Sequence, residues 1–352
     1  MTSDEPIGVP AGLTAVAGRG EPWASWIAGL PRLASEVLAE WELTIDGRLP
    51  GTDRTGFAAG ATALVMPVRD TAGARLVLKL TLVEDDNAGE IEALKAWRGL
   101  GAVRLERADP HRGALLLERL GPSDLNAVDA VEACDLVGRL YPRLHLPASP
   151  RLPRLSDFVT RWLDDLAALG RDVPAPPRFV QQALNAGRAL ASERGVTSAI
   201  VHGDLHYDNV LAGRREPWCV IDPKGFAGDP AYEPAPMLWN RWDELAATRE
   251  VGNALRGRFY ALVDASGLDE LRCRDWVVVR SMIGVAWEVL DARAAGRPLS
   301  EAQHEWITRL VTTAKAMQAD REKCIQAGAS DYIAKPVDMD QLLSILRVWL
   351  DR

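Results

Sequence analysis

The sequence contains few cysteines, and none is placed for metal binding or cross-linking. Four cysteines are spread along 352 residues, with no C-x-x-C pair and no histidine nearby at ligand spacing. This distribution argues against a structural zinc site and against a disulfide framework. We expect the four to be buried as small apolar side chains: Cys134, Cys219, Cys273 and Cys324.

The sequence also lacks a segment that predicts membrane insertion or export. No stretch approaches the roughly eighteen apolar residues of a membrane-spanning helix. The first twenty residues contain no basic segment followed by an apolar run, as a signal peptide would. We therefore expect a cytoplasmic protein without a membrane partner. The formal net charge of −8 disfavours nucleic acid as a partner and is compatible with a cationic small molecule.

Lysine is rare and unevenly distributed. Three lysines lie in the first 310 residues and three in the last forty, whereas arginine is the usual basic residue elsewhere. We interpret this shift as a change of sequence origin near Thr312. The six are Lys79, Lys95, Lys224, Lys315, Lys323 and Lys335.

The N-terminal third predicts a β-rich lobe that carries one internal helix. Residues 63–68 and 75–83 are rich in β-branched and apolar residues and flank a turn. A helical pattern follows at 88–99. Two further strand-like segments lie at 102–105 and 114–120. An additional helix is expected before this lobe's sheet, over residues 26–41.

The remainder predicts a mainly helical lobe, which gives an α+β, two-lobed layout. A short β-rich segment over 199–222 interrupts the helical patterns. We expect an N-terminal nucleotide-binding lobe over 1–120, a catalytic and substrate lobe over 121–311, and a separate fragment over 312–352. The predicted helical segments lie near 127–146, 155–169, 177–194 and 236–317.

The segment over 201–210, V-H-G-D-L-H-Y-D-N-V, carries the strongest chemical signal. Asp204 and Asn209 stand five residues apart, which is the D-x-x-x-x-N spacing of a kinase catalytic loop. Phosphoryl transfer requires a carboxylate that accepts the hydroxyl proton and oxygen ligands that hold Mg²⁺. We predict Asp204 as the catalytic base and Asn209 and Asp222 as the metal ligands.

These motifs resemble those of a known kinase group. H-G-D-L-H-x-x-N-V-L, with I-D-P-K-G in place of D-F-G, is similar to the aminoglycoside phosphotransferases, which have a protein-kinase-like fold. The segments L-V-L-K-L, G-A-V-R-L-E, L-L-L-E-R-L and the run over 221–240 resemble the streptomycin 6-phosphotransferase/hydroxyurea phosphotransferase family. The resemblance covers most of the chain. It implies ATP, Mg²⁺ and a hydroxyl acceptor on a guanidinium-bearing aminoglycoside, with antibiotic resistance as the outcome.

The N-terminal lobe should supply the ATP-binding residues. Lys79 lies in a predicted strand, as expected for the lysine that pairs with phosphates. Its partner carboxylate should come from the next helix, where Glu90 shares a face with apolar residues and Glu92 does not; we choose Glu90. The small-residue loop around Gly60 and Thr62 is expected to cover the phosphates, although it is not G-x-G-x-x-G. The backbone near Glu118 and Leu120 is expected to bind the adenine edge.

Carboxylates near Asp204 should attract a cationic acceptor. Asp229, Glu233 and Glu288 are the candidates. Asp229 precedes a proline, however, so it could equally cap the following helix, and we favour that interpretation. The alternative acceptors are hydroxyurea, a sugar or another metabolite, and the alternative class is a non-catalytic nucleotide-binding module. Intact Asp204 and its partner residues argue against that class.

The last forty residues resemble the C-terminal end of a response-regulator receiver domain. This resemblance implies a helix over 320–327, a strand over 331–334, the pair Lys335-Pro336 and a final helix over 339–350. The phosphorylated aspartate and acidic metal pair of a receiver are missing, and forty residues cannot complete a doubly wound sheet. We therefore expect no complete receiver domain and no phosphorelay activity. The alternative is an ordinary C-terminal helical hairpin.

Overall fold

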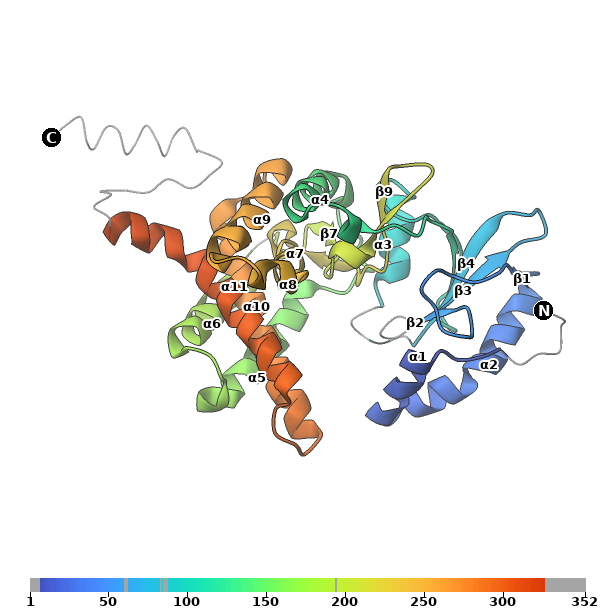
Figure 1. Cartoon of the computed structure of the whole chain (residues 1–352), viewed down its shortest axis with the longest axis horizontal. Coiled ribbons are helices and arrows are strands. Elements are labelled where there is room, and N and C mark those ends of the chain that lie inside the picture. Colours follow the sequence, from blue (N-terminus) through green and yellow to red (C-terminus); the bar gives the residue numbers. More distant parts are fainter. Residues whose placement is uncertain (1–6, 60–62, 83, 85–87, 194, 327–352) are drawn as a thin grey trace. The chain divides into compact units, whose positions relative to one another are not determined.

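The computed structural model describes residues 7–59, 63–82, 84, 88–193 and 195–326, with backbone only for Arg19 and for 318–326. The chain forms two compact units (Figure 1). Unit 1 comprises Met1–Asp124 together with Asn209–Gly225, and unit 2 comprises Leu125–Asp208 together with Phe226–Arg352. The division therefore falls within the predicted catalytic loop, between Asp208 and Asn209.

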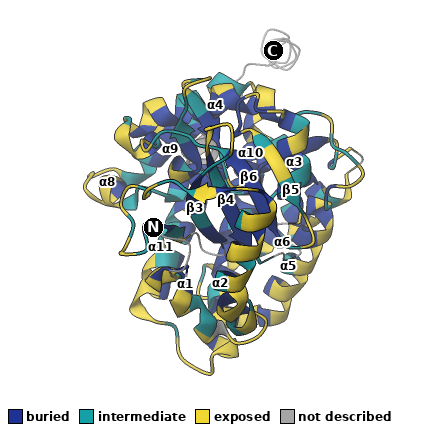
Figure 2. Cartoon of the chain, turned by 90° about the vertical axis from the view of Figure 1, so that its right-hand side faces the viewer, coloured by how far each residue is buried: buried dark blue, intermediate teal, exposed yellow. Residues whose placement is uncertain are grey.

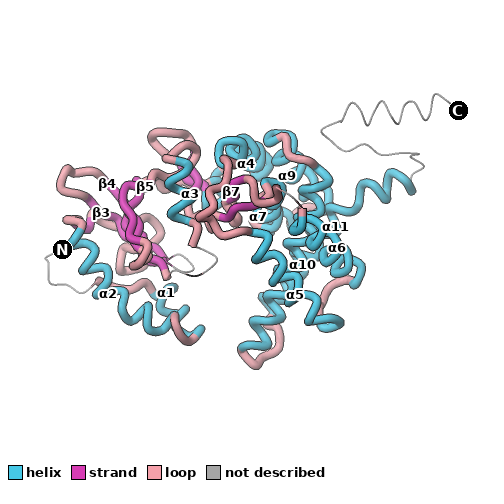
Figure 3. The backbone as a smooth tube through the Cα atoms, turned by 180° about the vertical axis from the view of Figure 1, so that it is seen from behind, coloured by secondary structure: helices cyan, strands magenta, loops and turns pink. Residues whose placement is uncertain are grey.

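Unit 1 is built on a six-stranded antiparallel sheet with the order β1-β3-β4-β6-β5, and β2 pairs with the start of β3. Figure 3 shows its strands β3, β4 and β5 in magenta. Alternation along β4 directs Leu78 and Leu80 into the apolar core and places Lys79 on the opposite face. The strands are β1 (Thr44–Ile45), β2 (Ala58–Ala59), β3 (Ala63–Arg69), β4 (Arg75–Thr81), β5 (Leu105–Asp109) and β6 (Ala114–Glu118).

Helices and a second hairpin complete unit 1. The apolar side of α2 packs on the core face of the sheet through residues such as Leu30 and Val37, both fully buried (Figure 2). The elements are α1 (Ala11–Val16), η1 (Ala17–Arg19), α2 (Trp23–Glu40), α3 (Glu90–Trp97), β8 (Val210–Ala212) and β9 (Trp218–Val220).

The predicted strands over 63–68, 75–83 and 114–120 are confirmed, but the strand over 102–105 is wrong. Ala102 forms only an isolated bridge with Val220, and the Val103 N–H donates to the Val220 carbonyl at 2.9 Å. This segment therefore pairs with the end of β9, and β5 begins only at Leu105.

Unit 2 is mainly helical, and α10 is its central helix. This helix is buried on most sides because it packs against α5, α6 and α11. A two-stranded antiparallel sheet, β7 with β10, leads into the predicted catalytic loop. The elements are η2 (Leu125–Ala127), α4 (Ala130–Leu144), α5 (Leu155–Leu169), η3 (Gly170–Asp172), α6 (Pro177–Ser192), β7 (Ala199–Val201), η4 (Tyr207–Asn209), β10 (Phe226–Gly228), η5 (Pro230–Tyr232), α7 (Ala235–Trp239), α8 (Trp242–Ala246), α9 (Val251–Ser266), α10 (Glu270–Ala294) and α11 (Glu301–Gln326).

Three of the four cysteines are buried, as expected: Cys134, Cys219 and Cys273. Burial raises the pKa of the Cys134 thiol to about 12, so this thiol stays protonated at neutral pH. The side chain of Cys324 lies outside the described residues. No helix in the described part of the chain combines the length and apolar character needed to cross a bilayer.

Helix α11 passes through the predicted boundary at Thr312 without a break. Thr313, Ala314 and Met317 are buried in unit 2. The Arg274 guanidinium, also buried, donates to the Met317 carbonyl at 2.6 Å. The first turns of the fragment assigned to 312–352 are thus part of the helical core. The predicted receiver-like strand, Lys335 and final helix lie outside the described residues.

These contacts predict different effects for two truncations. Deleting 318–352 should leave the urea-unfolding free energy, and the phosphotransferase activity that the sequence motifs predict, close to those of the full chain. Deleting 312–352 removes the buried Met317 side chain and the acceptor of Arg274, and should destabilise the protein by about 3 kcal/mol or more. Equal stability of the two truncated proteins would contradict the contribution of residues 312–317.

Candidate active site

Lys79 is the centre of a buried ionic cluster in unit 1. Its Nζ atom lies 2.6 and 2.8 Å from the two carboxylate oxygens of Glu90, and it also contacts Asp222. Lys79 and Glu90 are 6% and 3% exposed, so their charges are compensated mainly by each other and by Asp222. The structure thus brings together the predicted pair from β4 and α3.

The carboxylates keep the Lys79 ammonium charged. Burial alone would lower the pKa of Lys79, but the attraction of Glu90 and Asp222 outweighs burial and raises it above its ordinary value. A charged, immobilised ammonium in this position is suited to binding an anionic group such as a phosphate.

Asp222 follows β9 in a conformation that is unusual for an aspartate. Its φ is 57°, in the left-handed region, and its side chain is 58% exposed. Such conformations are concentrated at functional sites because surrounding contacts must hold them. The contact with Lys79 is one of those constraints, and more than half of the side chain is exposed to solvent.

A close backbone approach holds the segment after Asp222 against the start of α3. A Cβ atom on Gly89 would lie 1.7 Å from the Gly225 carbonyl oxygen, so a larger residue cannot occupy that position. Gly225 itself has a φ of 73°. This contact, which we did not predict, fixes Asp222 beside Lys79 and Glu90. The only sign of this contact in the sequence is that residues 89 and 225 are both glycines.

The β8–β9 hairpin brings the second predicted metal ligand to the same part of unit 1. Val210 pairs with Val220, and the Ile221 N–H donates to the Asn209 carbonyl at 2.9 Å. Asn209 and Asp222 therefore come from facing ends of one hairpin. An amide and a carboxylate are oxygen ligands that suit Mg²⁺.

The described residues contain no group of three or more His, Cys, Asp or Glu that could hold a metal alone.

In unit 2, the loop that carries Asp204 is held by a buried carboxylate. Glu233, which is fully buried, accepts hydrogen bonds from the N–H groups of His202 and, at 3.2 Å, of Gly203. His145 Nε2 lies 3.8 Å from the same carboxylate. Asp204 itself is half-buried and lies between the buried residues Leu205 and Gly203.

Glu233 is ionised in this environment. Burial would raise its pKa, but the nearby imidazoles of His145 and His202 and the hydrogen bond from the His202 N–H lower it below the ordinary value. The loop before Asp204 is therefore anchored by charge-assisted hydrogen bonds, which are stronger than neutral ones.

Two predicted substrate carboxylates are engaged inside unit 2. Glu233 binds the backbone N–H groups of His202 and Gly203, as described above. The other carboxylate is Asp229, whose Oδ1 accepts a hydrogen bond from the Ala231 N–H at 3.0 Å and caps η5. Its Oδ2 accepts from Trp276 Nε1 and Arg272 Nε, each at 2.6 Å. Capping by Asp229 is therefore confirmed. The structure does not support binding of substrate by these two buried carboxylates, because protein donors already occupy their oxygens.

The remaining predicted residues are placed as follows. Glu288 lies half-buried on α10. The Glu118 N–H donates to the Arg104 carbonyl at 3.0 Å, so this N–H is not available to an adenine. Adenine binding by the backbone at Leu120 stays a prediction. Gly60 and Thr62 lie outside the described residues.

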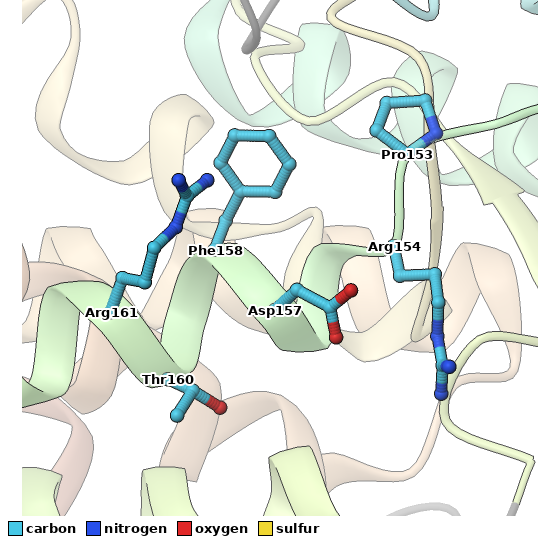
Figure 4. Close-up of a pocket in the computed structure, with 6 residues that line it drawn as sticks. All are labelled: Pro153, Arg154, Asp157, Phe158, Thr160 and Arg161. Atoms are coloured by element: carbon cyan, nitrogen blue, oxygen red, sulfur yellow. The ribbon is translucent and has the colours of Figure 1, made fainter.

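A shallow surface depression on α5 is a further feature of unit 2 (Figure 4). Phe158 packs on Phe226 of β10 with a centroid distance of 5.0 Å, and the Arg161 guanidinium lies 4.6 Å from the Phe158 centroid. Two arginines and one aspartate line the depression, so its net charge is positive and does not suit a cationic acceptor. The lining residues are Pro153, Arg154, Asp157, Phe158, Thr160 and Arg161.

Comparison with known families agrees with this arrangement. Residues 50–292 match the family described as aminoglycoside/hydroxyurea antibiotic resistance kinase. The chain belongs to this family. As a member of a kinase family it is an ATP-dependent phosphotransferase, and the predicted family is confirmed.

Individual relatives of this antibiotic resistance kinase align over most of their length. The chain is 37% identical to a streptomycin 6-kinase of Streptomyces glaucescens over 305 residues, covering 85% of this chain and 96% of that protein. It is 38% identical to a hydroxyurea phosphotransferase of Kitasatospora aureofaciens over 298 residues, covering 82% of each.

The fold also matches solved kinases. A choline/ethanolamine kinase family protein from Mesorhizobium loti aligns with a TM-score of 0.56 at 17% identity, covering 84% of this chain and 98% of that one. The α+β, protein-kinase-like fold class is confirmed.

The ionised state of Glu233 predicts a pH-dependent effect of the substitution Glu233→Gln. At pH 7.5 the variant should be less stable to urea by about 2 kcal/mol, because it loses charge-assisted hydrogen bonds. The folded-state pKa is below 4.5, the ordinary value for a glutamate, so the carboxylate stabilises the fold fully above that pH. Its contribution is lost as the pH falls through the lowered value.

The difference between wild type and variant should therefore be constant from pH 8 to about 5.5 and shrink at lower pH. Glu36→Gln is the control, since Glu36 forms only an exposed pair with Arg32 and should change stability by less than about 1 kcal/mol. A difference for Glu233→Gln that is as large at pH 4 as at pH 7.5 would contradict an ionised Glu233.

Proposed function

We propose that this kinase transfers the γ-phosphoryl group of ATP to a hydroxyl group of streptomycin. The observation that carries the proposal is its alignment with streptomycin 6-kinases from two organisms. The second, from Streptomyces griseus, is 34% identical over 315 residues and aligned over its whole length. The chain has a formal net charge of −8 at pH 7, which suits a substrate that carries positively charged guanidinium groups.

In this proposal Asp204 accepts the proton of the attacking hydroxyl group. Its half-buried carboxylate follows a backbone segment that Glu233 holds in place. Positioning matters because in phosphoryl transfer the protein contributes mainly orientation and electrostatic stabilisation. Asp204 orients the acceptor oxygen and removes its proton as the bond to phosphorus forms.

Lys79, Asp222 and Asn209 serve the nucleotide. Lys79 binds phosphate oxygens through its charged ammonium, and Glu90 holds that ammonium in place. Asp222 and Asn209 would hold Mg²⁺, which when bound neutralises charge that develops on the phosphate oxygens. The exposed part of the Asp222 carboxylate and its strained backbone support this role.

The remaining predictions follow from these roles. Glu288, half-buried on α10, stays our candidate for acceptor binding. We place the nucleotide on residues 1–120 and the acceptor on 121–311, and assign no phosphorelay role to 312–352. A cytoplasmic location follows from the need for ATP.

The similarity to a hydroxyurea phosphotransferase favours a second acceptor, hydroxyurea. The transfer chemistry is the same for both acceptors, because each presents a hydroxyl group to Asp204. The two acceptors differ in charge, since only streptomycin is a cation.

An ATP-consumption assay with each acceptor tests the proposal. Streptomycin should stimulate turnover by the wild-type protein, and Asp204→Asn should reduce kcat about a hundredfold or more because the base is removed. Spectinomycin, an aminocyclitol without guanidinium groups, serves as the negative acceptor. Stimulation by hydroxyurea alone would select the second candidate, and absence of stimulation by either acceptor would contradict the transferase proposal.

A further inference from the structure

The peptide unit between Gly203 and Asp204 is held at both of its polar ends. Its carbonyl oxygen accepts a hydrogen bond from Arg280 Nη2 at 2.8 Å, and its N–H donates to His202 Nδ1 at 3.3 Å. Gly203 has a φ of 85°, where glycine is favoured and where the backbone has many alternatives. Without these hydrogen bonds, the peptide plane before Asp204 would be weakly determined.

Arg280 is itself held in a fixed position. Its Nη1 atom donates to the Tyr232 carbonyl at 2.9 Å, so the two Nη atoms bridge two backbone carbonyls. The guanidinium carbon lies 3.9 Å from the centroid of the Tyr232 ring and 5.6 Å from that of Trp239. Trp276 packs edge-on against Tyr232 at 5.3 Å. A planar guanidinium stacked in this way has little freedom to move.

Glu233 and Arg280 act on different groups of the same loop. Glu233 holds the N–H groups of His202 and Gly203, whereas Arg280 holds the carbonyl of Gly203. Rotation of the peptide that follows Gly203 would leave the Glu233 contacts intact but would turn the Asp204 side chain. Arg280 thus restrains the peptide unit between Gly203 and Asp204, which Glu233 does not contact.

We propose that Arg280 is a positioning residue for the phosphoryl-transfer reaction. By fixing the carbonyl of Gly203, it fixes the plane of the peptide before Asp204 and hence the direction of the Asp204 carboxylate. Arg280 acts through the loop backbone. This inference rests on the proposed role of Asp204 as the base. Lysine cannot replace arginine here, because a single ammonium lacks the planar fork that binds two carbonyls while stacking on an aromatic ring.

The test compares Arg280→Met and Arg280→Lys with the matched control Arg274→Lys. Arg274 lies on the same helix, its guanidinium stacks near Phe259 at 5.5 Å, and it donates to a backbone carbonyl, that of Met317. Two quantities are measured on folded protein: kcat with KM for ATP and streptomycin, and hydrogen exchange of the peptide covering residues 200–206.

Both Arg280 variants should lower kcat about tenfold to a hundredfold, because small misplacements of a reacting group have effects of this size. KM for both substrates should change less than about twofold. Exchange of the Asp204 N–H should accelerate, whereas exchange of the Gly203 N–H, which Glu233 holds, should not. Arg274→Lys should lower stability while leaving kcat per folded molecule and exchange of the loop unchanged.

Two results would overturn the inference: unchanged exchange of the 200–206 segment in Arg280→Met, or faster exchange with an unchanged kcat. If Arg280→Met does not fold, Arg280→Lys decides by the same criteria. If the wild-type protein phosphorylates no acceptor, the proposed function fails on its own. Hydrogen exchange then still shows whether Arg280 holds the loop, and unchanged exchange again overturns the inference.

Discussion

The buried carboxylate of Glu233 is the constraint on which the geometry around Asp204 depends. An ionised group in a protein interior is stable only when donors surround it. In unit 2 those donors are two successive backbone N–H groups of the catalytic loop, with His145 close by. Satisfying the charge therefore fixes the loop, and the loop in turn presents Asp204. The same carboxylate thus stabilises the fold and, in the proposed mechanism, orients the catalytic base.

Unit 1 also contains a buried charged group, but in this case the charge is positive. The ammonium of Lys79 is buried between Glu90 and Asp222, which come from a helix and from the segment after β9. Residues 209–225 belong to unit 1, although Asn209 is the last residue of the predicted catalytic loop and Asp204 lies in unit 2. The backbone contact between Gly89 and Gly225 allows this approach, since neither position has space for a side chain.

Local patterns in the sequence predicted the chemistry-bearing residues and most of the elements. The spacing of Asp204 and Asn209, the alternation around Lys79 and the apolar face that contains Glu90 are each short-range signals. They identified residues that the structure brings into the expected contact, as for Lys79 and Glu90. Their catalytic roles stay predictions.

The long-range contacts could not be predicted in the same way. Glu233 binds N–H groups about 30 residues earlier, and Arg280 reaches a carbonyl 77 residues away. Glu233 was assigned to substrate because a carboxylate after the metal-binding motif is equally compatible with exposure or burial. Sequence composition suggested a boundary at Thr312, but the burial of Met317 depends on packing against α10, which composition does not reveal.

The most direct test of the account is the position of phosphate on the product. After reaction of the wild-type protein with ATP and streptomycin, phosphorus–proton correlation by NMR identifies the phosphorylated carbon. The account predicts a single phosphorus signal coupled to one carbon-bound proton of streptomycin, because the phosphoryl group is transferred to one hydroxyl group. Inorganic phosphate in place of a phosphorylated streptomycin would contradict it.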